Sequence, residues 1–239
     1  MNISGQNYYI DIHTFSPCSA ADTLQIINLF PEQVIDRLPA FSLLETDVNP
    51  YKCYYSLGWH PRHLREEKQT EYINLIAQVC QRKEILAVGE CGLDRLSEAS
   101  MDYQEAVFKK QALIAEEIGK PLLIHCVRAN NELIRIKKEL KPKAPWVVHG
   151  FNSKPVAGRE LLRHGFYISL GSDLLKPVSN ANEFISEIPL ERLFLETGDL
   201  SVSVKEIYSE AAMKSGQEIT LLVRNIRSNF TRVFQTDLA

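Results

Sequence analysis

Residues 101–125 read MDYQEAVFKKQALIAEEIGKPLLIH, and this stretch contains a complete helix-to-strand unit. Apolar side chains recur three or four positions apart over Met101–Ile118, which predicts an amphipathic helix with Ser100 as its N-cap. Gly119-Lys-Pro121 ends the helix, with the glycine as its C-cap, because proline cannot continue it. The run Leu122–His125 has the length and composition of a buried strand, and it ends in a histidine.

The same alternation of short apolar runs and longer amphipathic stretches continues in both directions along the chain. Alternation of this kind predicts a parallel sheet whose strands are joined by helices. The predicted strands are Tyr8–Ile12, Phe41–Glu45, Cys53–Leu57, Leu86–Gly89, Leu122–His125, Val147–His149, Tyr167–Leu170 and Leu193–Glu196. The predicted helices are Ala21–Leu29, Lys68–Arg82, Met101–Ile118, Asn130–Leu140, Lys154–Arg163, Asn182–Ile188, Val204–Ser215 and Glu218–Phe234.

Eight strands in 239 residues fit a compact (β/α)8 TIM barrel of the α/β class. Neither a repeat nor a linker-like stretch interrupts the chain, so we expect a single domain over residues 1–239. A doubly wound open sheet is the alternative fold. No G-x-G-x-x-G motif follows the first predicted strand, which weakens the nucleotide-binding form of that alternative.

Composition narrows the classes of partner and compartment. Lys and Arg number 27 and Asp and Glu number 30, so the net charge of −3 gives no basic field for sequence-blind duplex binding. A local phosphate-facing pocket remains compatible with this charge. The five cysteines contain no C-x-x-C pair, which argues against a disulfide framework or a zinc finger and predicts a reducing, cytoplasmic location. The N-terminus lacks the features of a signal peptide, and no apolar run is long enough to span a membrane.

Polar residues capable of chemistry gather at the ends of the predicted strands. In a barrel the carboxyl ends of all strands share one mouth, which is where active sites form, whereas an open sheet separates its first and last strands. These residues are Asp11, His13, His60, Glu90, Asp94, His125, His149, Glu196 and Asp199.

Three consecutive strands end at Glu90, His125 and His149, and this trio predicts a metal site. Imidazole nitrogens with a carboxylate oxygen suit Zn, Mn, Fe or Ni, and carboxylate-rich variants admit Mg. A lone histidine after a strand is more often a hydrogen-bonded structural residue, so His60 is interpreted as structural or as a substrate contact. His63 and His164 are interpreted as surface residues. The reaction class that the trio indicates is metal-assisted hydrolysis.

Five motifs in order along the chain resemble those of the TatD-related metal-dependent hydrolases. The resemblance runs from Asp11 to the terminal Asn229–Phe234, and it implies an amidohydrolase-like TIM barrel with divalent-metal phosphodiesterase activity. Typically such an enzyme is a deoxyribonuclease that trims DNA from the 3′ end. The motifs are Gly58-Trp-His60-Pro61, Gly89-Glu90-Cys-Gly-Leu-Asp94, Ile124-His125, His149-Gly-Phe151 and Phe194-Leu-Glu196-Thr197.

The resemblance also implies two metal sites, of which only one is complete in this chain. Glu90, His125 and His149 match the full ligand set of one metal. The other set requires an H-x-H pair and a late Asp, but the second His is Phe15 and the Asp position is Gly198. Asp199 stands one place late.

We therefore expect one firmly bound divalent cation, Zn, Mg or Mn, at Glu90, His125 and His149. His13 and Asp199 are expected to line the same pocket as further metal ligands. Either His13 assists the single ion, or a second ion arrives with the substrate.

Two functions of different class follow. In the first, the chain is a hydrolase of DNA or another phosphodiester, with Glu90 and Asp199 as catalytic residues and Asp199 as general base. His60 and Arg128 would contact the substrate, although Arg128 lies one residue beyond the arginine of the family's I-H-x-R motif. In the second, the barrel has lost turnover and binds a ligand or partner protein at the old mouth. Hydrolysis of a different ester, an amide or a lactone is a third, weaker reading.

Overall fold

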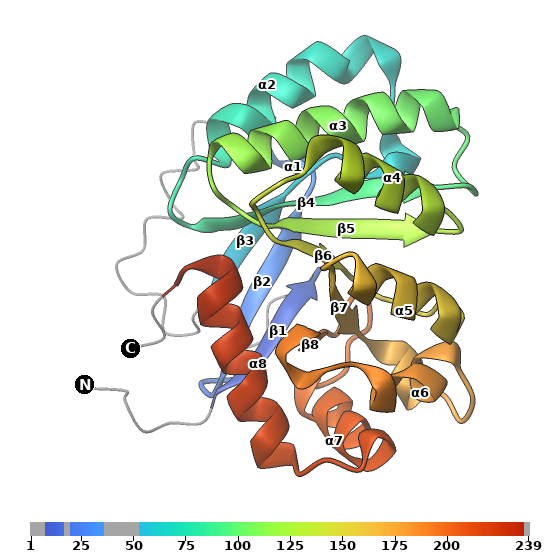
Figure 1. The fold of residues 1–239 in the computed structure, drawn as a ribbon. Coiled ribbons are helices and arrows are strands. Elements are labelled where there is room, and N and C mark those ends of the chain that lie inside the picture. Colours follow the sequence, from blue (N-terminus) through green and yellow to red (C-terminus); the bar gives the residue numbers. More distant parts are fainter. Residues whose placement is uncertain (1–7, 17–19, 36–52, 237–239) are drawn as a thin grey trace. The chain divides into compact units, whose positions relative to one another are not determined.

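The structure is a computed structural model, and it describes residues 8–16, 20–35 and 53–236 (Figure 1). Eight strands and eight α-helices lie in the described residues. The strands are β1 Tyr9–Thr14, β2 Thr23–Leu29, β3 Cys53–Leu57, β4 Ile85–Asp94, β5 Leu122–Val127, β6 Trp146–Val148, β7 Tyr167–Leu170 and β8 Leu193–Leu195. The helices are α1 Pro31–Ile35, α2 Gln69–Val79, α3 Met101–Glu117, α4 Asn130–Leu140, α5 Pro155–Arg163, α6 Asn180–Phe184, α7 Val204–Ser215 and α8 Ile219–Phe234.

The strands form one sheet in sequence order, from β1 to β8. The pairs β1–β2, β3–β4, β4–β5 and β7–β8 are all parallel, and helices follow most strands. This is the connectivity of the (β/α)8 class, so the predicted fold class is confirmed.

Two compact units make up the chain. Unit 1 comprises Met1–Ile27, Pro50–Cys53 and Val148–Ala239, and unit 2 comprises Asn28–Asn49 and Tyr54–Val147. In unit 2, α3 lies along β4 and beside α2 (Figure 1). The single domain over residues 1–239 stays a prediction.

Within unit 1 the first and last strands lie side by side. The Gly198 amide donates to the His13 carbonyl at 2.9 Å, and the Phe15 amide donates to the Gly198 carbonyl at 3.3 Å. Because β8 has only three residues, a side chain completes the bonding of β1 further along. The Tyr208 hydroxyl of α7 accepts from the Ile10 amide at 3.2 Å and donates to the Ile10 carbonyl at 3.1 Å. Both backbone groups of this buried residue are thus satisfied.

One predicted element is wrong and another lies outside the described residues. Residues Ala21–Leu29 were expected to be helical, but β2 occupies Thr23–Leu29 and pairs in parallel with β1. The first four residues of β2 are all buried, as in a strand covered on both faces, and such a run carries no two-residue alternation that would separate strand from helix. The predicted strand Phe41–Glu45 falls among the residues that the structure does not describe.

The predicted start of α3 at Met101 and its N-cap are confirmed, whereas its C-cap lies one residue before the predicted Gly119. The Ser100 hydroxyl accepts from the Tyr103 amide at 3.3 Å, as an N-cap does. The helix ends at Glu117 with Ile118 as its C-cap, and Gly119 follows in the left-handed region at φ 68°. In the described ranges, no helix is both long and apolar enough to cross a bilayer.

Candidate metal centre

In unit 2, Glu90 lies in a bulge of strand β4. Val88 pairs with Leu122 of β5, but Cys91 pairs with Ile124, so three steps along β4 face two along β5. Bulges of this kind redirect a side chain and are frequent next to active sites. The predicted strand stopped at Gly89, because glycine is typical of a strand end, whereas β4 continues through the bulge to Asp94.

Close backbone contact makes glycine necessary on both sides of Glu90. A Cβ on Gly89 would lie 2.4 Å from the Leu123 carbonyl oxygen, and one on Gly92 would lie 1.9 Å from the His125 carbonyl oxygen. From strand β2, the Asn28 side-chain oxygen accepts a hydrogen bond from the Glu90 amide at 2.8 Å. The backbone that carries Glu90 is therefore held from two directions.

Two histidines of unit 2 contact the Glu90 carboxylate. Its Oε1 lies 3.1 Å from His60 Nε2 and 3.1 Å from His125 Nδ1. The candidate ligand atoms of these three residues all lie within 4.8 Å of one another, close enough to surround one cation. Glu90 is buried and the two histidines are nearly so.

Asp94 fixes the orientation of the His125 ring. Its Oδ2 lies 2.9 Å from His125 Nε2. Burial acts to raise the pKa of the Asp94 carboxyl, but hydrogen bonds from His125, the Leu96 amide and Arg62 hold this pKa below its ordinary value. The carboxylate therefore accepts the Nε2 proton of His125 and leaves the Nδ1 lone pair facing Glu90. Metal-ligating histidines are typically held in this way, so these residues fit a divalent cation.

His60 is held in the opposite tautomer. Its Nδ1 accepts a hydrogen bond from the Arg62 amide at 3.1 Å, so a neutral ring carries its proton on Nε2, the nitrogen that faces Glu90. Burial lowers the pKa of His60, which favours this neutral form. The geometry suits a hydrogen bond from His60 to Glu90 better than a bond from His60 to a metal.

A second histidine–carboxylate pair lies in unit 1. His149 follows β6, and its Nδ1 lies 3.2 Å from Oε1 of the buried Glu196, which follows β8. Burial acts to raise the pKa of Glu196, but His149, with His13 nearby, holds this pKa below the ordinary value. The His13 and His149 ring centroids are 4.2 Å apart, so the structure brings these two predicted ligands together.

The remaining predicted residues of unit 1 are placed differently. Asp11 is fully buried and accepts from the Thr197 amide at 3.0 Å and the Thr197 hydroxyl at 2.7 Å, and burial raises its pKa to about 6. Asp11 thus ties β1 to the segment after β8. Asp199 is exposed and follows Gly198, which has a left-handed φ of 66°. The Phe15 and His13 rings pack edge to face, with centroids 5.1 Å apart.

The other sequence-based interpretations concern one arginine and two histidines. Arg128, expected to contact substrate, is exposed and has a positive φ of 55°. His63 is exposed, and His164 is the half-buried C-cap of α5.

Sequence reasoning did not assign Asp94 and Glu196 as the partners of the two histidines. Their positions at strand ends were a usable signal, because buried carboxylates there must find a partner. Asn28 gave no such signal, since it lay in the segment predicted as a helix.

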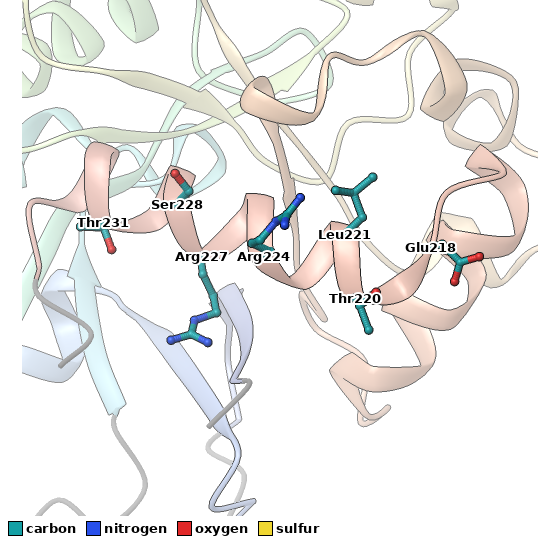
Figure 2. A pocket seen from close by; sticks show the side chains of 7 residues that line it. All are labelled: Glu218, Thr220, Leu221, Arg224, Arg227, Ser228 and Thr231. Carbon is teal, nitrogen blue, oxygen red and sulfur yellow. The ribbon is translucent and has the colours of Figure 1, made fainter. Parts of the chain in front are cut away.

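A surface groove of about 700 Å³ lies elsewhere, along the outward side of α8 (Figure 2). It contains two arginines but no histidine, so it does not coincide with the histidine clusters. Its lining residues are Glu218, Thr220, Leu221, Arg224, Arg227, Ser228 and Thr231.

Comparison with known proteins agrees with the motifs and the fold. The model of the family described as TatD related DNase matches residues 18–235. A Bacillus subtilis protein named uncharacterized metal-dependent hydrolase YabD is 31% identical over 147 residues, which are 60% of this chain and 57% of that protein. The chain thus spans less than two thirds of that relative. A Pantoea ananatis protein named 3′-5′ ssDNA/RNA exonuclease TatD is 24% identical over 76% of this chain and 78% of its own length.

Among solved structures, the TatD homologue YjjV of Escherichia coli K12 superposes with a TM-score of 0.80. The match covers 96% of this chain and 98% of that structure at 18% identity, so it supports the fold alone. The family match covers most of the sequence. The chain therefore belongs to the TatD-related DNase family.

Proposed function

We propose that this chain hydrolyses phosphodiester bonds in DNA with a divalent cation held by Glu90 and His125. The observation that carries the proposal is the contact between Glu90 Oε1 and His125 Nδ1, with Asp94 bonded to the other ring nitrogen. A divalent cation bound there would lower the pKa of a water and polarise a phosphoryl oxygen. The Pantoea relative, whose name states action on single-stranded DNA and RNA, supports the choice of bond.

The proposed roles follow from the contacts. Asp94 holds His125 with Nδ1 unprotonated, and His60 donates to Glu90 and keeps its carboxylate in place. His149 is oriented by Glu196 in the same manner, with Nε2 left for a ligand. The inclusion of His149 and His13 in the metal shell rests on the sequence motifs.

Asp199 is the proposed general base, because its exposed carboxylate is accessible to water. One firmly bound ion per chain is proposed, either Zn, Mg or Mn. A cytoplasmic location is proposed with it.

One observation favours the alternative of a barrel that binds without turnover. The Phe15 ring stands against His13, where the family motif carries a second histidine. A phenyl ring offers no lone pair to a metal, so this part of the site has one potential metal ligand fewer than the motif.

Metal content and cleavage test the proposal together. Protein purified without chelator is expected to contain about one divalent ion per chain and to shorten labelled single-stranded DNA when Mn²⁺ is added. Glu90→Gln should lose the ion and at least about 100-fold of the activity, because the amide is a weak ligand. His164→Ala, which changes a histidine at the end of α5, should retain both.

Three outcomes would count against parts of the proposal. Equal cleavage by wild type and Glu90→Gln would identify a contaminating nuclease. A bound ion without cleavage would support the binding alternative. Absence of any ion, with no change in melting temperature on adding Mn²⁺ or Zn²⁺, would refute metal binding.

A further inference from the structure

The side chain of Arg62 joins the network around His125 from the exposed side. It lies in the short 3-10 helix Pro61–His63 that follows β3, and its Nε donates to Asp94 Oδ2 at 2.5 Å. The same oxygen, Oδ2, faces His125 Nε2 at 2.9 Å. Arg62 and the proposed metal ligand His125 therefore share one carboxylate oxygen as a hydrogen-bond partner.

The terminal nitrogens of Arg62 remain available. The Arg62 side chain is 49% exposed, whereas the Asp94 side chain is fully buried. Within the part of the chain that the structure describes, Nε is the guanidinium nitrogen with a partner, and the two terminal nitrogens bond to no protein group. A guanidinium offers a planar fork of donors that matches two oxygens of a phosphate.

The pairing with Asp94 also prepares this fork for an anion. Because Nε is fixed on a buried carboxylate, the side chain loses less rotational freedom when it binds a second group. The Asp94 carboxylate offsets part of the guanidinium charge at Nε, and the delocalised charge is still shared by the two terminal nitrogens.

The neighbouring arginines are less suited to this role. Arg128 is exposed, and its backbone lies in the left-handed region at φ 55°. Arg95 pairs with Glu132. Of these three arginines at the ends of β3, β4 and β5, Arg62 is the one bonded to the network that holds His125.

We propose that Arg62 binds a phosphate of the substrate beside the metal ligands, in place of Arg128. This inference rests on the proposed function for the identity of the anion. It assigns to Arg62 the role of a substrate-binding residue whose direction is set by Asp94.

Binding without cleavage tests this assignment. The probe is a short fluorescein-labelled single-stranded oligonucleotide, followed by anisotropy in EDTA over a series of NaCl concentrations. Arg62→Met should weaken binding about tenfold at low salt and reduce the slope of log K against log salt by about 0.7, the value for one phosphate contact on a single strand. Arg62→Lys should fall between, because an ammonium keeps the charge but not the fork.

Arg135→Met is the matched control. Arg135 is 54% exposed and pairs with Glu105 at 2.5 Å, so it resembles Arg62 in exposure and ion pairing but lies on α4. Its substitution should leave both the affinity and the salt slope unchanged.

The inference would be overturned if Arg62→Met bound the probe like wild type while its melting temperature fell, since Arg62 would then be only the ion-pair partner of Asp94. Failure of wild type to bind the probe would overturn it too. Binding by wild type without cleavage after Mn²⁺ addition would refute the proposed hydrolysis and leave the assignment of Arg62 intact.

Discussion

Asp94 is the residue on which the unit 2 site depends most, because one of its oxygens accepts from both His125 and Arg62. It is fully buried, and its second oxygen accepts from the Leu96 amide at 2.8 Å. A carboxylate in this position keeps His125 in the tautomer that a metal requires. Its effect on the proposed metal site can therefore be tested separately from that of the proposed ligands.

Replacement of Asp94 by asparagine should weaken Mn²⁺ binding about 10- to 100-fold, as loss of a histidine's carboxylate partner commonly does. The amide keeps the shape of the side chain but removes its charge. Isothermal titration calorimetry would measure the change. Glu105→Gln, which breaks the matched pair with Arg135, should leave the affinity unaltered. Wild-type affinity in Asp94→Asn would show that His125 needs no such support.

At the residue scale, the sequence predicted which side chains lie together better than it predicted their hydrogen bonds. Glu90 and His125 were expected together, and the structure brings them into contact. The role of His60 could not be predicted, because it depends on the Arg62 amide that fixes the ring's proton. Hydrogen bonds to backbone amides leave no pattern in the order of side chains.

Among the elements, α3 forms side-chain hydrogen bonds to two segments that carry candidate site residues. Gln104 and Gln111 stand two turns apart on its buried face. The Gln111 amide accepts from the Trp59 amide at 2.7 Å and donates to the Trp59 carbonyl at 3.2 Å, next to His60. The Gln104 amide accepts from the Asp94 amide at 2.7 Å and donates to the Asp94 carbonyl at 3.0 Å.

Gln111→Leu should lower the free energy of unfolding by about 2–4 kcal/mol, because it leaves a buried N–H and a buried C=O without partners. Urea unfolding would measure the loss. Gln81→Leu serves as the control, since Gln81 is exposed and bonds only to the Ala77 carbonyl one turn before it. Its effect should stay within about 0.5 kcal/mol. An equal loss in both variants would contradict a stabilising role of the hydrogen bonds between Gln111 and Trp59.

The elements also show where sequence reasoning succeeds and fails. The bounds of β3, β7, α4 and α7 agree with those predicted, because periodicity and Gly or polar punctuation coincide there. The prediction for Thr23–Leu29 was wrong, since a strand buried on both faces shows no two-residue alternation of polar and apolar side chains. The predicted end of β4 at Gly89 was also wrong, because two glycines within one strand resemble a strand end.

For the molecule as a whole, a buried thiol and a buried phenol are expected to lower the free energy of unfolding at alkaline pH. Burial raises the pKa of the Cys80 thiol to about 12 and the pKa of Tyr208 well above its usual range. Both groups stay protonated in the native state, whereas the unfolded chain releases these protons near their ordinary values. The native state then binds more protons, so the free energy of unfolding falls as pH rises.

Cys80→Ala should reduce this alkaline loss. Between about pH 8 and about pH 10.5, the thiol alone is expected to account for about 2 kcal/mol of the decrease in wild type. The variant loses some stability at both pH values through the smaller side chain, so the quantity to compare is the difference between the two. Urea unfolding at each pH provides it. An identical difference in variant and wild type would show that the thiol does not remain protonated in the native protein.

The contact between Phe15 and His13 has a consequence for spectroscopy. The two rings meet edge to face at an interplanar angle of 83°, so the carbon-bound protons of the imidazole lie in the magnetic anisotropy of the phenyl group. Their resonances are displaced from those of an isolated histidine. Phe15, which offers no metal ligand at this position, thereby gives His13 a distinct signal in a proton NMR spectrum.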